Sequence, residues 1–277
     1  MRLGCSLVVC LLGFPAGASA QLPGDLLRPE RPPKAAPPEE PPPESEPREP
    51  APREGPEPRE RPSPRRVRKL SDERANSRFA FVVRRTWARE RPRSRSRRVK
   101  LLRTTTPDGT SELVLTLAEL RVGGDPRWVR VRLPMRPNGT TGWVPRSALG
   151  ALRAVHSSLL IDRRRLRATL RRRGRVVWRS PIGVGQPQWP TPRGRFYVRE
   201  RLIPVDPEGL YGVFAFGLSA YSRVLTDWPG GGMIGIHGTN QPELLPGRVS
   251  HGCIRLPNRA IARLRRQMGL GTPVLIR

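Results

Sequence analysis

Short runs of strand-forming residues, separated by turn signals, constrain the fold more than any other feature of this sequence. One run, Trp128–Leu133, alternates apolar and charged residues, as a half-buried strand does. Pro107-Asp108-Gly109 and Pro137-Asn138-Gly139 are typical turn sequences. The strand candidates lie at 79–83, 113–117, 128–133, 158–162, 166–170, 176–178, 196–198, 213–218, 233–236 and 272–276. We therefore predict a mainly β protein.

One helix is expected close to the C-terminal end of the sequence. Asn258 is a favourable N-cap, and Ile261, Leu264 and Met268 are spaced as on one face of a helix. Gly269 is the expected stop. The prediction for this part of the chain is therefore a β-sandwich or barrel with one or two short helices.

Residues 1–20 have the pattern of a signal peptide. Arg2 precedes the apolar run Leu3–Phe14, which is shorter than the roughly 20 residues that a membrane span needs. Ala18-Ser19-Ala20 fits a cleavage site. No later segment is apolar enough to cross a membrane, so we expect export to the cell wall, the extracellular space or the periplasm. A retained membrane anchor is the alternative.

Residues 21–78 are predicted to form a disordered, proline-rich linker. Sixteen prolines lie between residues 23 and 64, interspersed with glutamate and arginine. Such a segment buries too little apolar surface to offset the entropy of ordering it. Residues 65–78 are basic and polar, and we expect them to continue the linker.

Residues 79–150 are predicted to form a small β domain that resembles a bacterial Src-homology-three-like barrel. Trp128-Val129-Arg130-Val131 and Gly142-Trp143-Val144-Pro145 flank a glycine-containing turn, as in the closing hairpin of such barrels. The resemblance implies binding to peptides or wall polymers. The alternative is that both tryptophans simply belong to the core of a small β domain.

Cysteine usage points to a single working thiol. Of the three cysteines, Cys5 and Cys10 lie in the signal peptide, so cleavage leaves only Cys253 and no internal disulfide. A lone thiol oxidises outside the cell and is a liability there unless it has a function. The alternative is a buried, inert cysteine that packs as a small hydrophobe.

The net charge of +29 comes from 52 lysine and arginine residues against 23 aspartate and glutamate residues. For an exported protein, this charge favours anionic wall polymers or lipid headgroups as partners over nucleic acid. A solvated arginine-rich surface without a partner is the alternative.

The densest group of reactive side chains comprises His237, His251 and Cys253, which lie within 17 residues. A cysteine nucleophile needs a base or a positive charge beside it, because its free thiol has a pKa of about 8.5. His237 ends a predicted strand, and the loop after it contains prolines and glycine that turn the chain back. This would place an imidazole beside the sulfur. Gly252 permits close approach of the backbone, and the Gly252 and Cys253 amides are candidates for an oxyanion hole.

Other interpretations of these side chains remain open. The two histidines and Cys253 would supply only three zinc ligands, and His-x-Cys is not a usual chelating pair. They are also compatible with hydrogen-bonded histidines near an inert cysteine. His156 is expected to be structural. A mobile lid over the site or an ordinary loop is expected from Tyr211, Trp228 and Gly230–Gly232.

The sequence around these residues resembles the YkuD-type L,D-transpeptidase catalytic domain. Ser250-His251-Gly252-Cys253, an apolar residue and Arg255 follow an upstream His237-Gly238-Thr239, as in that family's signature. A second similarity is Thr191-Pro192-Arg193-Gly194-Arg195-Phe196-Tyr197, and Gly183-Val184-Gly185 and Gly217-Leu218-Ser219 also fit. The resemblance covers about 152–277 and implies a catalytic domain over residues 151–277.

The resemblance implies a monomeric peptidoglycan L,D-transpeptidase that acts on stem peptides and forms 3-3 cross-links without a metal or other cofactor. Cys253 would be the nucleophile and His237 the general base and acid, with its ring oriented by the Gly238 carbonyl. The residues implied to line the site are Ser250, His251, Gly252 and Arg255. Arg255 is a candidate for holding a substrate carboxylate, although family members often have Asn there.

Three other functions are compatible with the sequence. An L,D-carboxypeptidase would use the same cysteine and histidine but transfer the acyl group to water. A non-catalytic wall-binding protein would rely on the small β domain and the basic surface. A nucleic-acid-binding protein would rely on charge alone, and the signal peptide argues against it.

Overall fold

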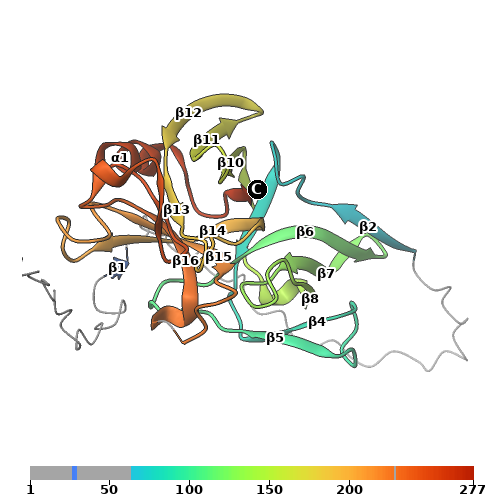
Figure 1. The fold of residues 1–277 in the computed structure, drawn as a ribbon. Coiled ribbons are helices and arrows are strands. Elements are labelled where there is room, and N and C mark those ends of the chain that lie inside the picture. The colour runs from blue at the N-terminus through green and yellow to red at the C-terminus, as the bar shows by residue number, and fades with distance from the viewer. Residues whose placement is uncertain (1–26, 30–63, 228) are drawn as a thin grey trace, which may run out of the picture.

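The computed structural model describes residues 27–29, 64–227 and 229–277. The described residues form two sheets and one α-helix, which confirms the predicted mainly β class (Figure 1). The predicted signal peptide and most of the predicted linker lie outside these residues. None of the helices in the described part is long and apolar enough to cross a membrane.

The smaller sheet is formed by strands between residues 65 and 155 and is cyan to green in Figure 1. Its strand order is β5-β4-β8-β7-β6-β3-β9, and β2 pairs with β6. Its core contains Val114, Val129, Val131 and Val144, all fully buried. The elements are β2 Arg65–Lys69, β3 Ser77–Phe81, β4 Thr86–Arg89, β5 Arg98–Leu102, β6 Leu113–Val122, β7 Asp125–Arg132, β8 Thr141–Pro145, the 3₁₀ helix η1 Arg146–Ala148 and β9 Arg153–Val155.

Two strands lie wholly inside the predicted linker. The expectation that residues 65–78 continue the linker is wrong over β2, which pairs antiparallel with β6 through the register Val67↔Leu120. Every residue of β2 is exposed, so the strand has no apolar pattern in its sequence. It is held by backbone hydrogen bonds and by the ion pair of Arg68 with Glu119. Similarly, β1 (Leu27–Pro29) pairs with the strand that contains Ile203.

The larger sheet has the order β12-β11-β10-β19-β14-β15-β16-β18-β13-β17, with β1 paired to β14. Its strands and the 3₁₀ helices between them are β10 Ser157–Asp162, β11 Arg167–Arg172, β12 Arg175–Pro181, β13 Gly183–Gly185, β14 Gly194–Pro204, β15 Ala215–Tyr221, η2 Pro229–Gly232, β16 Met233–His237, η3 Pro242–Leu244, β17 Gly247–Ser250, β18 Ile254–Arg255 and β19 Pro273–Ile276. The predicted hairpin over 158–170 is confirmed by the pairing of β10 with β11.

The α-helix, α1, spans Asn258–Gln267 and packs Ile261 and Leu264 into the core of the larger sheet. Its existence confirms the prediction, but the predicted cap is wrong. Pro257 is the N-cap residue and makes no side-chain cap, whereas Asn258 is the first helical residue. The side chain of Asn258 bonds to other loops instead, as described below.

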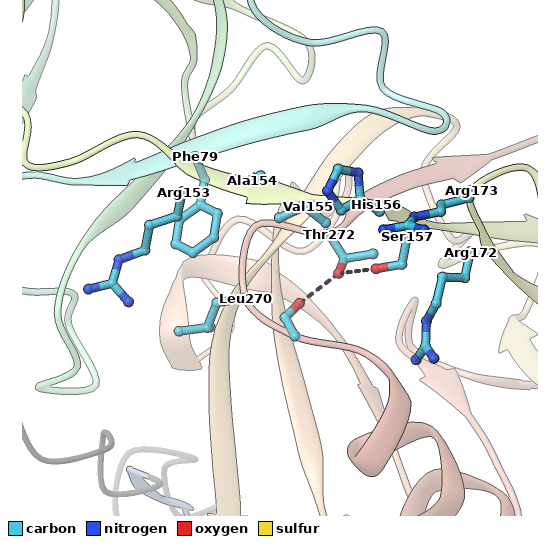
Figure 2. A pocket seen from close by; sticks show the side chains of 11 residues that line it. Phe79, Arg153, Ala154, Val155, His156, Ser157, Arg172, Arg173, Leu270 and Thr272 are labelled. Carbon is cyan, nitrogen blue, oxygen red and sulfur yellow. Dashed lines mark hydrogen bonds between the residues drawn. The ribbon is translucent and has the colours of Figure 1, made fainter.

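The two sheets are joined by buried contacts. Tyr197 of β14 packs with Phe79, Leu113 and Leu115 of the smaller sheet, and its hydroxyl donates to the Leu113 carbonyl over 3.2 Å. Beside this junction lies a surface pocket of about 600 Å³ (Figure 2). His156 lines it and bonds Asn76 through Nδ1 at 3.2 Å.

Candidate active site

The site forms where β16 and β18 run side by side. The two strands pair in parallel with the register Ile236↔Ile254 and His237↔Arg255. Because side chains alternate along a strand, this register places Cys253 and His237 on the same face. A side-chain carbon placed on Gly235 would lie 3.9 Å from both Sγ of Cys253 and Cδ2 of His237. The thiol and the imidazole therefore flank the same glycine.

Both side chains open into one small pocket of about 60 Å³. A cavity needs roughly 10–15 Å³ of such space to hold one water molecule, so this pocket admits a reacting carbonyl group but not a whole peptide. A peptide substrate must therefore lie across the mouth of the pocket. The lining residues are Leu210, Tyr211, Ser222, Leu225, Gly232, Met233, Ile234, His237, Ser250, His251, Cys253 and Arg255.

The imidazole of His237 is buried and held in one orientation. Its Nδ1 donates to the Gly238 carbonyl over 2.6 Å, which leaves Nε2 as the nitrogen without a proton. The ring of Tyr211 meets it edge-on, with centroids 4.9 Å apart. Burial lowers the pKa of His237 to about 4, assisted by the charge of Arg255 and opposed by the bond to Gly238. The ring is therefore neutral at pH 7.

The thiol of Cys253 accepts a hydrogen bond from the Gly235 amide at 3.3 Å, and the residue as a whole is half-buried. Burial raises the pKa of Cys253 above its usual value, while that amide and the charge of Arg255 lower it in part. At neutral pH the site therefore contains an uncharged thiol and an uncharged imidazole. A reaction at the sulfur requires the proton to move as the new bond forms.

The turn before Cys253 is fixed by its own polar groups. The Ser250 hydroxyl donates to the Cys253 carbonyl over 2.6 Å and accepts the Gly252 amide at 3.1 Å. The Gly252 amide is thus already bonded, contrary to the expected oxyanion hole at that position. Gly252 has a φ of +120°, a conformation that favours glycine, and its carbonyl accepts the Thr191 hydroxyl at 2.8 Å.

Arg255 and His251 differ in their exposure to solvent. Arg255 is buried, and its Nη1 donates to Gln241 Oε1 over 3.1 Å. Its Nε is buried and has no hydrogen-bond partner within the described part of the chain. His251 is exposed and packs against the Trp189 ring, with centroids 4.2 Å apart. Partial burial of its ring against Trp189 and the nearby charge of Arg255 lower the pKa of His251.

The structure thus brings Cys253, His237, Ser250, His251 and Arg255 to one pocket. The remaining predicted residues, Gly238 and Gly252, contribute backbone behind it. Of the predicted lid residues, Tyr211 and Gly232 line the pocket. Trp228 lies outside the described residues. In the part of the chain that the structure describes, no group of three or more His, Cys, Asp or Glu side chains is arranged to hold a metal ion.

Sequence reasoning missed the contacts of Asn258. Its Oδ1 accepts the Thr239 amide at 3.1 Å and the Val213 amide at 3.4 Å, which ties down the loop after His237. A side-chain carbon on Gly238 would overlap that oxygen, so only glycine fits there. From the sequence, Asn258 is expected to cap the helix instead, because asparagine at the start of a helix is usually a cap.

Comparison with known proteins assigns a class to the part of the chain that holds this site. Residues 157–276 match the sequence model of the YkuD family, the L,D-transpeptidase catalytic domain. Two proteins named "Putative L,D-transpeptidase YkuD", from Bacillus licheniformis and Bacillus subtilis, are 36% identical over 104 residues and 35% identical over 108 residues. These alignments cover 38% and 39% of this chain and 55% and 58% of the relatives. The chain therefore matches little more than half the length of these curated relatives.

Solved structures are also similar to the chain. The Enterococcus faecium L,D-transpeptidase C442S mutant is 26% identical, with a TM-score of 0.34, and 44% of this chain and 49% of that chain are covered. Bdellovibrio bacteriovorus Bd1075 is 28% identical, with a TM-score of 0.35, over 44% of this chain and 47% of that chain. The family match confirms the predicted resemblance of the catalytic domain. The resemblance of residues 79–150 to a Src-homology-three-like barrel stays a prediction.

Proposed function

We propose that this chain is an exported peptidoglycan L,D-transpeptidase that forms 3-3 cross-links through a cysteine acyl-enzyme. One observation carries the proposal: Cys253 and His237 share a pocket on one face of the β16–β18 pair, with the ring of His237 oriented by the Gly238 carbonyl. The family match over residues 157–276 and the similarity to the two Bacillus YkuD proteins support it.

In the first step, Sγ of Cys253 attacks the carbonyl carbon of the diamino acid in a stem tetrapeptide. His237 Nε2 takes the thiol proton as the carbon–sulfur bond forms. The bond to the terminal D-alanine then breaks, and the imidazolium gives its proton to the leaving amine. This sequence suits a neutral pair, because neither partner has to be charged before the substrate binds.

In the second step, the side-chain amine of another stem attacks the thioester. His237 accepts a proton from that amine and returns one to the departing sulfur, which restores the neutral pair and leaves a 3-3 cross-link. With the Gly252 amide already bonded to Ser250, the Cys253 amide is the remaining candidate of the two for binding the oxyanion. We also propose that Arg255, which lines the pocket, donates to a carboxylate or carbonyl group of the stem.

The proposal is tested with a defined tetrapeptide donor, an amine acceptor and mass analysis of the products. The full chain is expected to release D-alanine and give the 3-3 dimer, and Cys253→Ala and His237→Gln are expected to lose at least about 100-fold in rate. His156→Gln is the matched control, because this exposed histidine lies outside the lining of the thiol pocket. If free tripeptide forms without dimer, the chain is an L,D-carboxypeptidase and not a transpeptidase. If no product forms, both activities are rejected.

We further propose that residues 1–20 direct export and that residues 79–150 form a wall-binding barrel of the Src-homology-three-like kind. Within the catalytic domain, an arginine-rich face is the proposed contact for anionic wall polymers. Arg167, Arg171 and Arg179 surround a groove of about 190 Å³ on β11 and β12. Binding to an isolated wall polymer should weaken with salt, and Arg171→Gln with Arg179→Gln should reduce that salt dependence. Unchanged binding would remove this face from the proposal.

A further inference from the structure

The loop between β7 and β8 of the smaller sheet bonds to a segment that lines the thiol pocket. We define the rim as Tyr221–Leu225 together with Gly231 and Gly232. Three of its residues, Ser222, Leu225 and Gly232, line the same pocket as Cys253. A peptide lying across the pocket mouth therefore has the rim as one of its walls. The rim follows a strand of the larger sheet, and two side chains from the smaller sheet, Arg136 and Asn138, bond to it.

Arg136 bonds to both ends of the rim at once. Its Nε donates to the Ser222 carbonyl over 2.7 Å, and its Nη2 donates to the Gly231 carbonyl over 2.8 Å and to the Leu225 carbonyl over 3.2 Å. The guanidinium also lies over the ring of Tyr221, 5.2 Å from its centroid. One planar group with several fixed donors thus satisfies three rim carbonyls, a geometry that the single ammonium of lysine does not offer.

Asn138, two residues further along the same loop, pairs with the backbone of Tyr221. Its Nδ2 donates to the Tyr221 carbonyl over 2.7 Å, and its Oδ1 accepts the Tyr221 amide at 3.0 Å. The pairing imitates one rung of a β-ladder at the point where β15 ends. Asn138 therefore holds the first residue of the rim, and Arg136 holds the residues that follow it.

The packing around Arg136 leaves little freedom. Gly232 has a φ of +71°, and a side-chain carbon there would lie 2.8 Å from Nη2 of Arg136. The Gly232 carbonyl accepts the Ser222 amide at 2.8 Å, which closes the rim on itself. The Val224 and Leu225 amides also donate to the Ser222 hydroxyl. Without Arg136, three rim carbonyls would lose this donor, and water would have to replace it.

We propose that Arg136 and Asn138 are positioning residues for acyl transfer, because they hold the rim in the place where it supports the acyl-donor peptide. Neither residue touches the reacting atoms. The inference rests on the proposed function and deepens it, since it makes the smaller β domain part of the substrate site. A second contact agrees with this arrangement: Arg199, which is paired with Glu112, has Nη1 at 3.8 Å from the sulfur of Met233, another lining residue.

The test compares Arg136→Ala, Arg136→Lys and Asn138→Ala in the full chain with Arg130→Ala as the matched control. Arg130 is an exposed arginine of β7 whose side chain bonds only Thr141 among the contacts described for it. Three measurements are made: amide hydrogen exchange of the rim by mass spectrometry, kcat and KM for the tetrapeptide donor, and the rate of Cys253 alkylation by iodoacetamide.

For Arg136→Ala, we expect at least about tenfold faster exchange at Tyr221–Leu225 and a kcat/KM lowered about 10- to 100-fold, mainly through KM. The alkylation rate should stay within about twofold, because iodoacetamide is too small to need the rim. Arg136→Lys should recover part of the loss, and Arg130→Ala should match the wild type. Equal rim exchange in Arg136→Ala and the control, or faster exchange with kcat/KM unchanged, would overturn the inference.

The outcome separates this inference from the proposed function. If the wild type transfers no acyl group, the proposed function fails and the positioning role fails with it, whatever the exchange data show. If the wild type cross-links and the variants at 136 and 138 do so equally well, only the positioning role fails. A drop in kcat with KM unchanged would place the effect on the chemistry rather than on donor binding, and would also contradict the inference.

Discussion

At the scale of single residues, the site is defined by two shifts of pKa in opposite directions. Burial lowers the pKa of His237 and raises the pKa of Cys253, so both groups are neutral near pH 7. A thiolate–imidazolium pair would instead need strong local stabilisation of two buried charges. The neutral pair exposes no charged nucleophile to oxidants while no substrate is bound, because the thiolate, not the thiol, reacts with them.

The burial of His237 predicts a loss of stability in acid. Its pKa is about 4 in the folded chain, against an ordinary value of 6.5. Above pH 6.5 His237 binds no proton in either the folded or the unfolded chain, so its shifted pKa does not lower the free energy of unfolding. As the pH falls from 6.5 towards 4, only the unfolded chain binds it, and the folded state loses up to about 3 kcal/mol. Urea unfolding at pH 7 and at pH 4.5 measures this loss.

His237→Gln is the control for that measurement, because glutamine does not titrate and every other group is retained. The difference in unfolding free energy between wild type and variant should shrink or change sign as the pH falls. Parallel pH dependences for the two proteins would contradict a depressed pKa at position 237. The same pKa predicts that the proposed acyl transfer persists to about pH 5 and is lost as His237 becomes protonated at about pH 4.

At the scale of elements, a strand was predictable where its own residues show a pattern of apolar and polar side chains or are flanked by turn residues. Strand β7 alternates and the β10–β11 hairpin is flanked by turns, so both were predictable. Strands β13 and β18 are three and two residues long and are held by their partner strands. They are too short to show an alternation of apolar and polar residues in the sequence. Strand β2 is exposed throughout and shows no apolar pattern.

The same distinction holds for the site residues. His237 and Cys253 were predictable because cysteine and histidine are rare in this chain and lie in a family-like motif. The support given by Thr191 to the Gly252 carbonyl joins residues 61 positions apart, and that of Arg136 to Leu225 joins residues 89 positions apart. Such contacts depend on the tertiary fold, and a single sequence carries no local signal for them.

At the scale of the whole molecule, the two sheets meet through a buried ion pair within a cluster of apolar side chains. Glu112, just before β6, pairs with Arg199 of β14, and both side chains are only 4% exposed. Arg199 Nε donates to Glu112 Oε1 over 2.8 Å, and Nη2 donates to the other carboxylate oxygen. Tyr197 lies in the adjoining apolar cluster with Leu113 and Leu115. This continuity predicts that the two sheets unfold together.

Removing one partner of this pair should destabilise the whole molecule. Glu112→Ala leaves the Arg199 charge buried without its carboxylate, which costs about 3–5 kcal/mol. Replacing both, Glu112→Leu with Arg199→Met, should recover most of that loss because no charge then stays buried. The exposed pair Arg97–Glu90, at 3.2 Å and with side chains 71% and 52% exposed, is the control, and Glu90→Ala should cost less than about 1 kcal/mol.

Urea unfolding followed by tryptophan fluorescence and by far-ultraviolet circular dichroism tests whether the two sheets respond as one unit. Trp87, Trp128 and Trp143 report on the smaller sheet, and Trp178 reports on the larger one. Coincident transitions that shift together in Glu112→Ala are expected, because the buried pair belongs to both sheets. Two separate transitions, with only one of them shifted in Glu112→Ala, would mean that the two sheets unfold independently. The contacts of Arg136 with the rim would then form without a rigid junction between the sheets.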